Sequence, residues 1–243
     1  MSGRWRMPWT VIALRSASVQ GFAPMNSFWL DELQWWMDLL THWNRKSLFL
    51  SPELLIPTHA VEFAPFTDAS GSEANAGAGA VFGKYWQAFL FTREEAKILP
   101  ICDLEGVVSV LWLTEVCHRW PEQIAGKRFM AWCDNTTFVG AVNGHKSSAP
   151  TLAFLLGYLH DLMARFSFDL RLKYVKSAEN VAADAASRED WVRFYSFMES
   201  VGYARADMVR IPVQASLRTS LTSKMMSMRS LKTAMESEPR LAC

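Results

Sequence analysis

Apolar residues between Ser27 and Trp43 recur at steps of three and four positions, the spacing that gathers side chains on one face of a helix. They are Phe28, Trp29, Leu33, Trp36, Leu40 and Trp43. Asp31 and Glu32 stand near the start, where the helix dipole favours negative charge. The pattern predicts an amphipathic helix over about 27–43.

The pattern is lost over the next residues. Asn44 to Lys46 is polar, and Pro52 and Pro57 interrupt an apolar stretch, which is typical of an irregular connector and not of a continued helix. We expect a domain boundary near Pro57, so that residues 1–57 form an N-terminal segment.

Short runs rich in β-forming residues follow, separated by small and polar residues that indicate turns. They cover 61–67, 76–83 and 85–92 and predict three consecutive strands of an antiparallel meander. Pro65 falls within the first run and removes one donor from the ladder. We therefore expect that strand to be bulged, or to turn this position away from its neighbour.

The second half of the chain alternates helices and strands. Helical spacing covers 102–120, where Pro121 stops it, and returns over 151–166 and 180–198. An apolar run over 129–133 and an alternating one over 168–175 predict two more strands. The former ends at Asp134 and Asn135, and active sites of α/β folds favour the carboxyl ends of strands. The fold class expected is α/β.

Composition narrows the picture only a little. With 243 residues, 50% of them hydrophobic and 20% charged, the chain suits one domain with flanking segments. A net charge of +1 gives no global sign of nucleic-acid binding, so such binding has to be argued from a local site. The four cysteines form no CxxC pair, which indicates a reducing compartment and no zinc site.

Two further features concern location and the C-terminal end. No uncharged apolar run approaches the roughly 20 residues that span a membrane. The apolar stretch at the start of the chain is too short for a secretory signal. We expect a soluble, intracellular protein of the cytoplasm or nucleus with no membrane partner. Beyond about Val209 the chain turns to Ser, Thr, Met, Arg and Lys without a clear period, which predicts a basic tail over 201–243 that is disordered or weakly helical.

Four acidic residues stand where an acid is unfavourable for folding, because a buried charge without a partner is expensive. Asp68 follows a strand and Glu105 lies in the apolar register of a helix. Asp134 ends a buried strand, and Asp184 lies among alanines. Together they make a candidate site.

Glu105 gives the clearest reason to expect a bound cation. Val108 and Trp112 lie three and seven residues on, so its carboxylate shares the helix face that packs against the sheet. A divalent cation would supply the missing counter-charge. Mg²⁺ prefers oxygen ligands, and two ions about 4 Å apart that clamp an attacking water and a leaving oxygen need several shared carboxylates.

Each motif also has an ordinary explanation. Residues 67–70 suit a turn after a strand, and residues 134–136 suit a helix cap. Asp103, Glu179 and Asp190 are rival carboxylates, of which Asp103 suits the helix N-terminus as a cap or dipole partner. The joint order of the four acids is therefore what indicates a metal site.

That order resembles the type 1 ribonuclease H domain of reverse transcriptases, in particular those of DIRS-like and Gypsy-like retroelements. The motifs are TDAS at 67–70, DLEGVV at 103–108, CDNTT at 133–137 and NVAADAASR at 180–188, and the match spans about 61–188. The resemblance implies a ribonuclease H-like domain over 58–200, with a five-stranded mixed sheet in the order 3-2-1-4-5 and helices on both faces.

The segment from Phe28 to Leu50 resembles the connection region that joins polymerase to ribonuclease H in DIRS-like elements. This likeness implies that the chain is a C-terminal fragment of a larger polyprotein. A polymerase domain absent from the chain is then an expected partner.

The resemblance also implies a two-metal endonuclease that hydrolyses the RNA strand of an RNA·DNA hybrid and leaves a 3′-hydroxyl and a 5′-phosphate. Its catalytic metal ligands, for two Mg²⁺ ions or for Mn²⁺, would be Asp68, Glu105, Asp134 and Asp184. Asn135 and Thr136 would lie near the nucleic-acid strand. Cellular members carry a histidine in the loop before the last aspartate, and residues 174–179 contain none, which predicts slower product release or proton transfer.

Three other interpretations stay open. An element-derived domain that keeps the fold can bind nucleic acid or partner subunits without cutting. A transposase or integrase uses a similar fold with three carboxylates, although the motif at 180–188 and the upstream helix favour ribonuclease H. A purely structural module follows if the acids prove to be dispersed over the surface.

Overall fold

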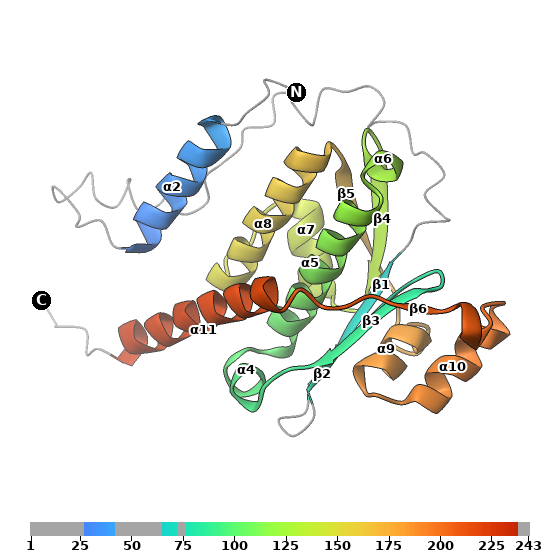
Figure 1. Cartoon of the computed structure of the whole chain (residues 1–243). Helices are drawn as coiled ribbons and strands as arrows, with labels where there is room; N and C mark the ends of the chain where they lie inside the picture. Colours follow the sequence, from blue (N-terminus) through green and yellow to red (C-terminus); the bar gives the residue numbers. More distant parts are fainter. Residues whose placement is uncertain (1–26, 42–64, 72–75, 238–243) are drawn as a thin grey trace, which may run out of the picture.

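The computed structural model describes residues 27–41, 65–71 and 76–237 (Figure 1). The predicted N-terminal helix is confirmed as α2 (Ser27–Thr41). The connector and the domain boundary expected near Pro57 lie outside the described residues. No helix in the described part of the chain is long and apolar enough to cross a membrane.

A mixed sheet organises the rest of the molecule. Its strands are β1 (Phe66–Ser70), β2 (Gly77–Phe82), β3 (Tyr85–Leu90), β4 (Arg128–Cys133), β5 (Asp169–Tyr174) and β6 (Val209–Arg210). They lie in the order β5-β4-β1-β2-β3-β6. The first three strands form the predicted antiparallel meander, whereas β4 and β5 run parallel to β1.

The predicted sheet needs two corrections. It has six strands in the described residues and not five, because β6 adds parallel to β3 through bonds from Val209 N to Lys84 O and from Ile211 N to Trp86 O. The order of the other five is as predicted. Pro65 precedes β1 instead of bulging it, and its carbonyl accepts from Trp132 N at 2.8 Å.

Helices cover both faces of the sheet (Figure 1). On one side lie α4 (Arg93–Ile98), α5 (Ile101–Arg119), α6 (Pro121–Ile124), α7 (Thr136–Gly144) and α8 (Pro150–Phe166). On the other lie α9 (Val181–Ser187) and α10 (Trp191–Ser200), which pack against Val81, Trp86 and Ala88. The single helix predicted over 180–198 is thus two helices, because the chain turns at Glu189 with a φ of 56°.

Of the two alternatives predicted for the tail over 201–243, disorder is wrong for its described part, which is largely helical. Residues 205–207 form a 3₁₀ turn, β6 follows, and α11 (Ala215–Ser237) packs on α5 and α8. Leu221 and Met225 are buried, four residues apart on one face. Two ion pairs add to this packing, Arg218 with Glu95 at 2.6 Å and Arg229 with Asp103 at 2.8 Å.

Two glycines allow α9 to approach the sheet closely. A Cβ at Gly77 would collide with the Ser187 carbonyl oxygen, and one at Gly79 with that of Ala183. Both colliding atoms are backbone, so no side-chain rotation relieves the contact. The distance between α9 and β2 therefore depends on the absence of side chains at these two positions.

We expect Gly79→Ala to lower the free energy of unfolding by about 1–3 kcal/mol, because α9 must move to admit the methyl group. Gly157→Ala is the matched control: Gly157 lies within α8 with nothing within 4 Å of its Cβ position. The control should gain roughly 0.5–1 kcal/mol from the better helix propensity of alanine. Urea unfolding measures both, and equal effects would contradict the close contact.

Arg229→Met should destabilise the chain by about 3 kcal/mol or more, because it strands the Asp103 carboxylate, whose side chain is 0% exposed. Adding Asp103→Asn should recover much of the loss, since the amide is neutral and still accepts from Thr151 Oγ1. Arg165→Met, at an exposed pair with Asp161, should change the free energy by less than about 0.5 kcal/mol. A double variant as unstable as Arg229→Met would show that the lost packing dominates.

Candidate metal centre

Four elements bring the predicted acids to one end of the sheet. Asp68 is the third residue of β1, so the prediction that it follows the strand, in a turn over 67–70, is wrong. Asp134 directly follows β4, whose Cys133 is paired with Thr67. Glu105 lies near the start of α5, which packs on β1 and β2. Asp184 lies in α9, which also packs on β1 and β2. The structure therefore gathers the acids and does not disperse them over the surface.

Asp68 is buried, with 4% of its surface exposed. The Ser187 hydroxyl donates to its Oδ2 at 2.5 Å. Burial raises the pKa of Asp68 to about 6, the hydrogen bond from Ser187 opposes that rise, and the charges of Asp134 and Asp184 add to it. Asp68 is thus within electrostatic reach of two of the other acids.

Glu105 is 7% exposed and its Oε2 has no hydrogen-bond partner among the described residues. Burial, together with the neighbouring charges of Asp134 and Asp68, raises the pKa of Glu105 to about 8, against the lowering effect of a hydrogen bond from Asn135. A neutral acid is therefore the stable form of Glu105 at pH 7 while no cation compensates its charge.

Asp134 accepts a hydrogen bond from Ser177 Oγ to Oδ2 at 2.9 Å, whereas its Oδ1 is buried without a partner among the described residues. One carboxylate oxygen each from Asp134 and Glu105, with the Cys133 sulfur, lie within 4.8 Å of one another. Burial raises the pKa of the Cys133 thiol, so this sulfur stays protonated. A soft, protonated sulfur is a poor ligand for Mg²⁺, which leaves the oxygens as ligands.

Asp184 differs from the other acids because guanidinium groups occupy both of its oxygens. Arg188 Nε is 2.8 Å from Oδ1, and Arg193 Nη1 is 2.5 Å from Oδ2. The hydrogen bond to Asp184 raises the pKa of Arg188, and the charges of Asp184, Asp68 and Asp134 also raise it. Arg188 therefore lies in the field of three of the four acids.

The donor set fits a hard divalent cation. Asp68, Glu105 and Asp134 provide carboxylate oxygens, and the described residues compensate their charge mainly by hydrogen bonds from hydroxyl and amide groups. Two of these oxygens, Glu105 Oε2 and Asp134 Oδ1, are buried and have no partner among the described residues. Buried polar atoms in native proteins nearly always have partners, so an orphaned carboxylate oxygen calls for an explanation. A cation bound between Glu105, Asp134 and Asp68 would provide one.

The two predicted nucleic-acid contacts have different surroundings. Asn135 is half-buried and caps α7, with Oδ1 accepting from Phe138 N at 3.0 Å. Thr136 is exposed at the first position of α7, two residues after Asp134. The motif at 134–136 therefore has both predicted roles: Asn135 caps a helix, and Asp134 belongs to the acid cluster.

The rival carboxylates have other partners or lie in solvent. Asp103 is held by Arg229 and Thr151, and Asp190 caps α10 by accepting from Arg193 N. Glu179 is exposed. None of these three acids therefore needs a cation to compensate its charge.

Two of the histidines contact each other. His145 follows α7 and His160 lies in α8, with Nδ1 of the former 3.1 Å from Nε2 of the latter. Burial lowers the pKa of both rings, so they are neutral at pH 7. The pair therefore adds no positive charge to its surroundings.

Sequence reasoning missed the residues that contact the acids. Arg188 could have been found, because it lies four positions after Asp184 on the same helix. Arg193 could not, since its contact requires the turn at Glu189. Ser177 and Ser187 are ordinary polar positions in the sequence, and only the fold places them against Asp134 and Asp68.

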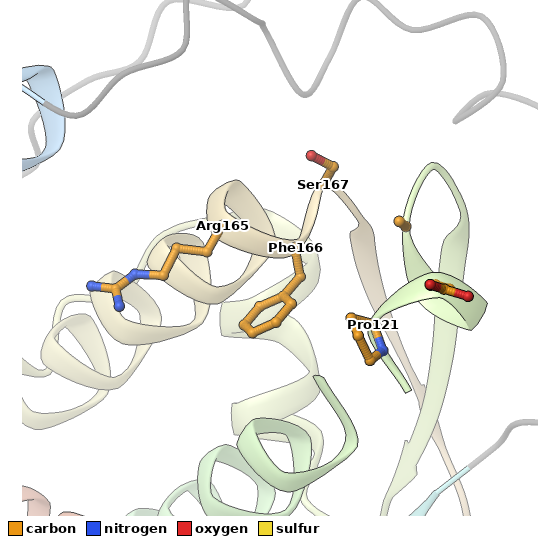
Figure 2. A pocket seen from close by; sticks show the side chains of 6 residues that line it. Pro121, Arg165, Phe166 and Ser167 are labelled. Carbon is orange, nitrogen blue, oxygen red and sulfur yellow. The ribbon is translucent and has the colours of Figure 1, made fainter. Parts of the chain in front are cut away.

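An open hollow of about 260 Å³ lies elsewhere, between the end of α8 and the start of α6. Figure 2 shows Phe166 and Pro121 on opposite sides of it, while Arg165 points away. The hollow borders the segment that leads into β4, whereas Asp134 follows the other end of that strand. It is therefore separate from the acid cluster.

No protein-family model matches the chain, and no curated protein matches it. The chain is similar to solved ribonuclease H structures. LC11 ribonuclease H1 from compost, in complex with an RNA/DNA hybrid, is 13% identical over 54% of this chain and 99% of that one, with a TM-score of 0.44. Ribonuclease H1 of Halobacterium salinarum is 14% identical over 53% and 98%, with a TM-score of 0.35.

A third similar structure is the N-terminal ribonuclease H domain of Rv2228c from Mycobacterium tuberculosis. It is 17% identical over 57% of this chain and 97% of that one, with a TM-score of 0.37.

The elevated pKa of Glu105 predicts how stability depends on pH. Between its ordinary value of 4.5 and about 8, the folded chain holds a proton at Glu105 that the unfolded chain has lost, so the contribution of Glu105 to stability falls as pH rises through this range. Excess Mg²⁺ should raise the Tm more at pH 8 than at pH 6, because the cation binds the deprotonated acid.

The comparison is between wild type and Glu105→Gln, with EDTA or Mg²⁺, by thermal unfolding. In EDTA the Tm of the variant relative to wild type should rise from pH 6 to pH 8, since the variant lacks the titrating group. Taking the difference between the two proteins cancels other buried groups, such as His160, whose pKa is lowered to about 4 by burial. A difference that does not change with pH would rule out the titration of Glu105.

Proposed function

We propose that this chain is a metal-dependent endonuclease that hydrolyses the RNA strand of RNA·DNA hybrids, as the ribonuclease H part of a retrotransposon reverse transcriptase. One observation carries the proposal: carboxylates from four separate elements converge at the carboxyl ends of β1 and β4, those of Asp68 and Glu105 are buried, and two of the carboxylate oxygens have no partner among the described residues. The sheet order of β1 to β5 agrees with that implied by the motif resemblance.

Two divalent ions, when bound, would clamp the attacking water and the leaving oxygen of a phosphodiester. Asp68, Glu105 and Asp134 are the residues placed to hold them, with Asp184 at the α9 side of the cluster. Glu105 gives up its proton as the site fills, because the cation compensates the charge that burial disfavours. Cleavage of the P–O3′ bond by water leaves the 3′-hydroxyl and the 5′-phosphate.

Selection of the RNA strand needs groups beside the acids that can contact a 2′-hydroxyl. Thr136 is exposed at the start of α7, and Ser177 lies in the loop before α9 with its hydroxyl on Asp134. We place the RNA strand across these positions, so that Asn135 and Thr136 face its backbone. Mg²⁺ is the expected ion because every available ligand is a carboxylate oxygen.

A polymerase domain is the proposed partner of the N-terminal helix. Leu30, Leu33, Met37 and Leu40 of α2 are between 38% and 61% exposed. Their spacing of three, four and three residues places them on one side of the helix, which is typical of a surface that packs against another element. We name a polymerase domain as the partner because this segment resembles the connection region that joins polymerase to ribonuclease H.

A non-catalytic domain that binds nucleic acid is the second candidate. The arginine pairs of Asp184 favour it, because they fill both oxygens of one of the four expected ligands. The orphaned oxygens of Glu105 and Asp134 favour the enzyme, since a site without a cation has no use for them.

The test is cutting of a labelled RNA·DNA hybrid by the full chain in Mg²⁺ or Mn²⁺. Asp134→Asn should lower the rate by at least a hundredfold, roughly the effect of losing several kcal/mol of metal-ion stabilisation. Asp161→Asn is the matched control: it removes an acid on α8 that pairs with Arg165, outside the cluster, and should cut like wild type.

Duplex DNA and duplex RNA complete the design. Cutting of the hybrid alone supports ribonuclease H, whereas strand joining or cutting of duplex DNA supports the transposase interpretation. A folded wild-type chain that binds the hybrid in either metal and leaves it intact would replace the proposal by the non-catalytic candidate.

A further inference from the structure

The arginines on Asp184 compete directly with a metal ion. Each carboxylate oxygen of Asp184 accepts a charge-assisted hydrogen bond, from Arg188 and from Arg193. A divalent cation draws on the same carboxylate charge and is repelled by both guanidinium groups, so the two arginines weaken Asp184 as a metal ligand. Asp184 therefore becomes a strong ligand only when at least one arginine moves.

Both arginines have room to move. Their side chains are 59% and 42% exposed for Arg188 and Arg193, whereas that of Asp184 is 13% exposed. They flank the turn at Glu189, with Arg188 at the end of α9 and Arg193 in the first turn of α10. The guanidinium groups thus lie at the solvent side of Asp184.

The planar guanidinium group matches a phosphate as well as it matches a carboxylate. A nucleic-acid strand brought to the cluster carries phosphates into the field of four acids, which repels them. Arg188 already lies in the field of Asp184, Asp68 and Asp134. An arginine released from Asp184 would therefore find a phosphate oxygen of the bound strand close by, at the place where positive charge is needed.

We infer that Arg188 and Arg193 form a two-position clamp, closed on Asp184 in the free chain and transferred to phosphate oxygens of the RNA strand when a divalent ion takes the Asp184 carboxylate. This inference rests on the proposed function. Binding of the last metal ion and binding of the substrate then strengthen each other. The substrate phosphates draw the arginines away from Asp184, and the metal ion at Asp184 releases the arginines for the phosphates. The free chain then has a weak metal site at Asp184.

The test uses the full chain with Arg188→Gln and Arg193→Gln together. Mn²⁺ binding without nucleic acid, measured by electron paramagnetic resonance, should become roughly tenfold tighter at the weaker site, since the competing hydrogen bonds are gone. Hybrid binding in Ca²⁺, measured by fluorescence anisotropy, should become weaker. The slope of log affinity against log salt should fall by about 1 to 2, the change expected when two phosphate contacts are lost.

Two further variants keep the test decisive. Arg165→Gln removes the arginine of another i,i+4 pair, with Asp161 at 2.9 Å, and should change none of the three readouts. Arg188→Lys with Arg193→Lys keeps both charges and the tie between α9 and α10. It should retain the salt slope while losing part of the hybrid affinity, because lysine lacks the guanidinium fork.

Unchanged Mn²⁺ affinity and an unchanged salt slope in the glutamine variant would overturn the inference and leave the arginines as a tie between α9 and α10. If wild type cuts the hybrid in that case, the proposed function stands without the clamp. If wild type neither binds nor cuts the hybrid, the proposed function fails first and the phosphate half of the inference fails with it.

Discussion

Negative charge buried without a counter-charge is the constraint on which the site depends. Burial raises the pKa of Asp68 and of Glu105, and the charges of neighbouring acids add to that rise. The cluster therefore opposes folding while no cation is bound, and the remainder of the core has to hold it in place. The closely packed α5, buried along most of its length between the sheet and α8, does so for Glu105.

The buried charge of Asp68 is partly compensated because the sheet has glycines where α9 crosses it. Gly77 and Gly79 let the backbone of α9 lie directly on β2, and this brings Ser187 within hydrogen-bonding distance of Asp68. A hydroxyl at that distance partly compensates a carboxylate that has no cation. The position of Asp184, three residues earlier in the same helix, follows from the same contact. Backbone packing and site geometry are thus one feature.

Periodicity predicted the long helices α2, α5 and α8, the strands β2 to β5 and the order of these elements, because burial on one face leaves a regular spacing of apolar residues in the sequence. The first strand was predicted over 61–67, whereas β1 covers Phe66–Ser70. The four acids were predictable because they interrupt apolar patterns. The two-residue β6 has no period to find. The Ser- and Thr-rich composition of α11 concealed Leu221 and Met225, and its ion pairs join residues more than a hundred positions apart. The turn at Glu189 has a positive φ but no glycine, the residue that usually indicates such a turn in a sequence.

Two acids near the start of α5 show how the fold separates structure from chemistry. Asp103 and Glu105 are two positions apart, about 200° around the helix, so their side chains leave on opposite sides. Asp103 meets Arg229 and Thr151 and is fully compensated by protein groups. Glu105 meets other acids and keeps an oxygen without a partner among the described residues. A fold that supplies an arginine to one buried acid and further carboxylates to the next leaves the second to be neutralised by something outside the chain.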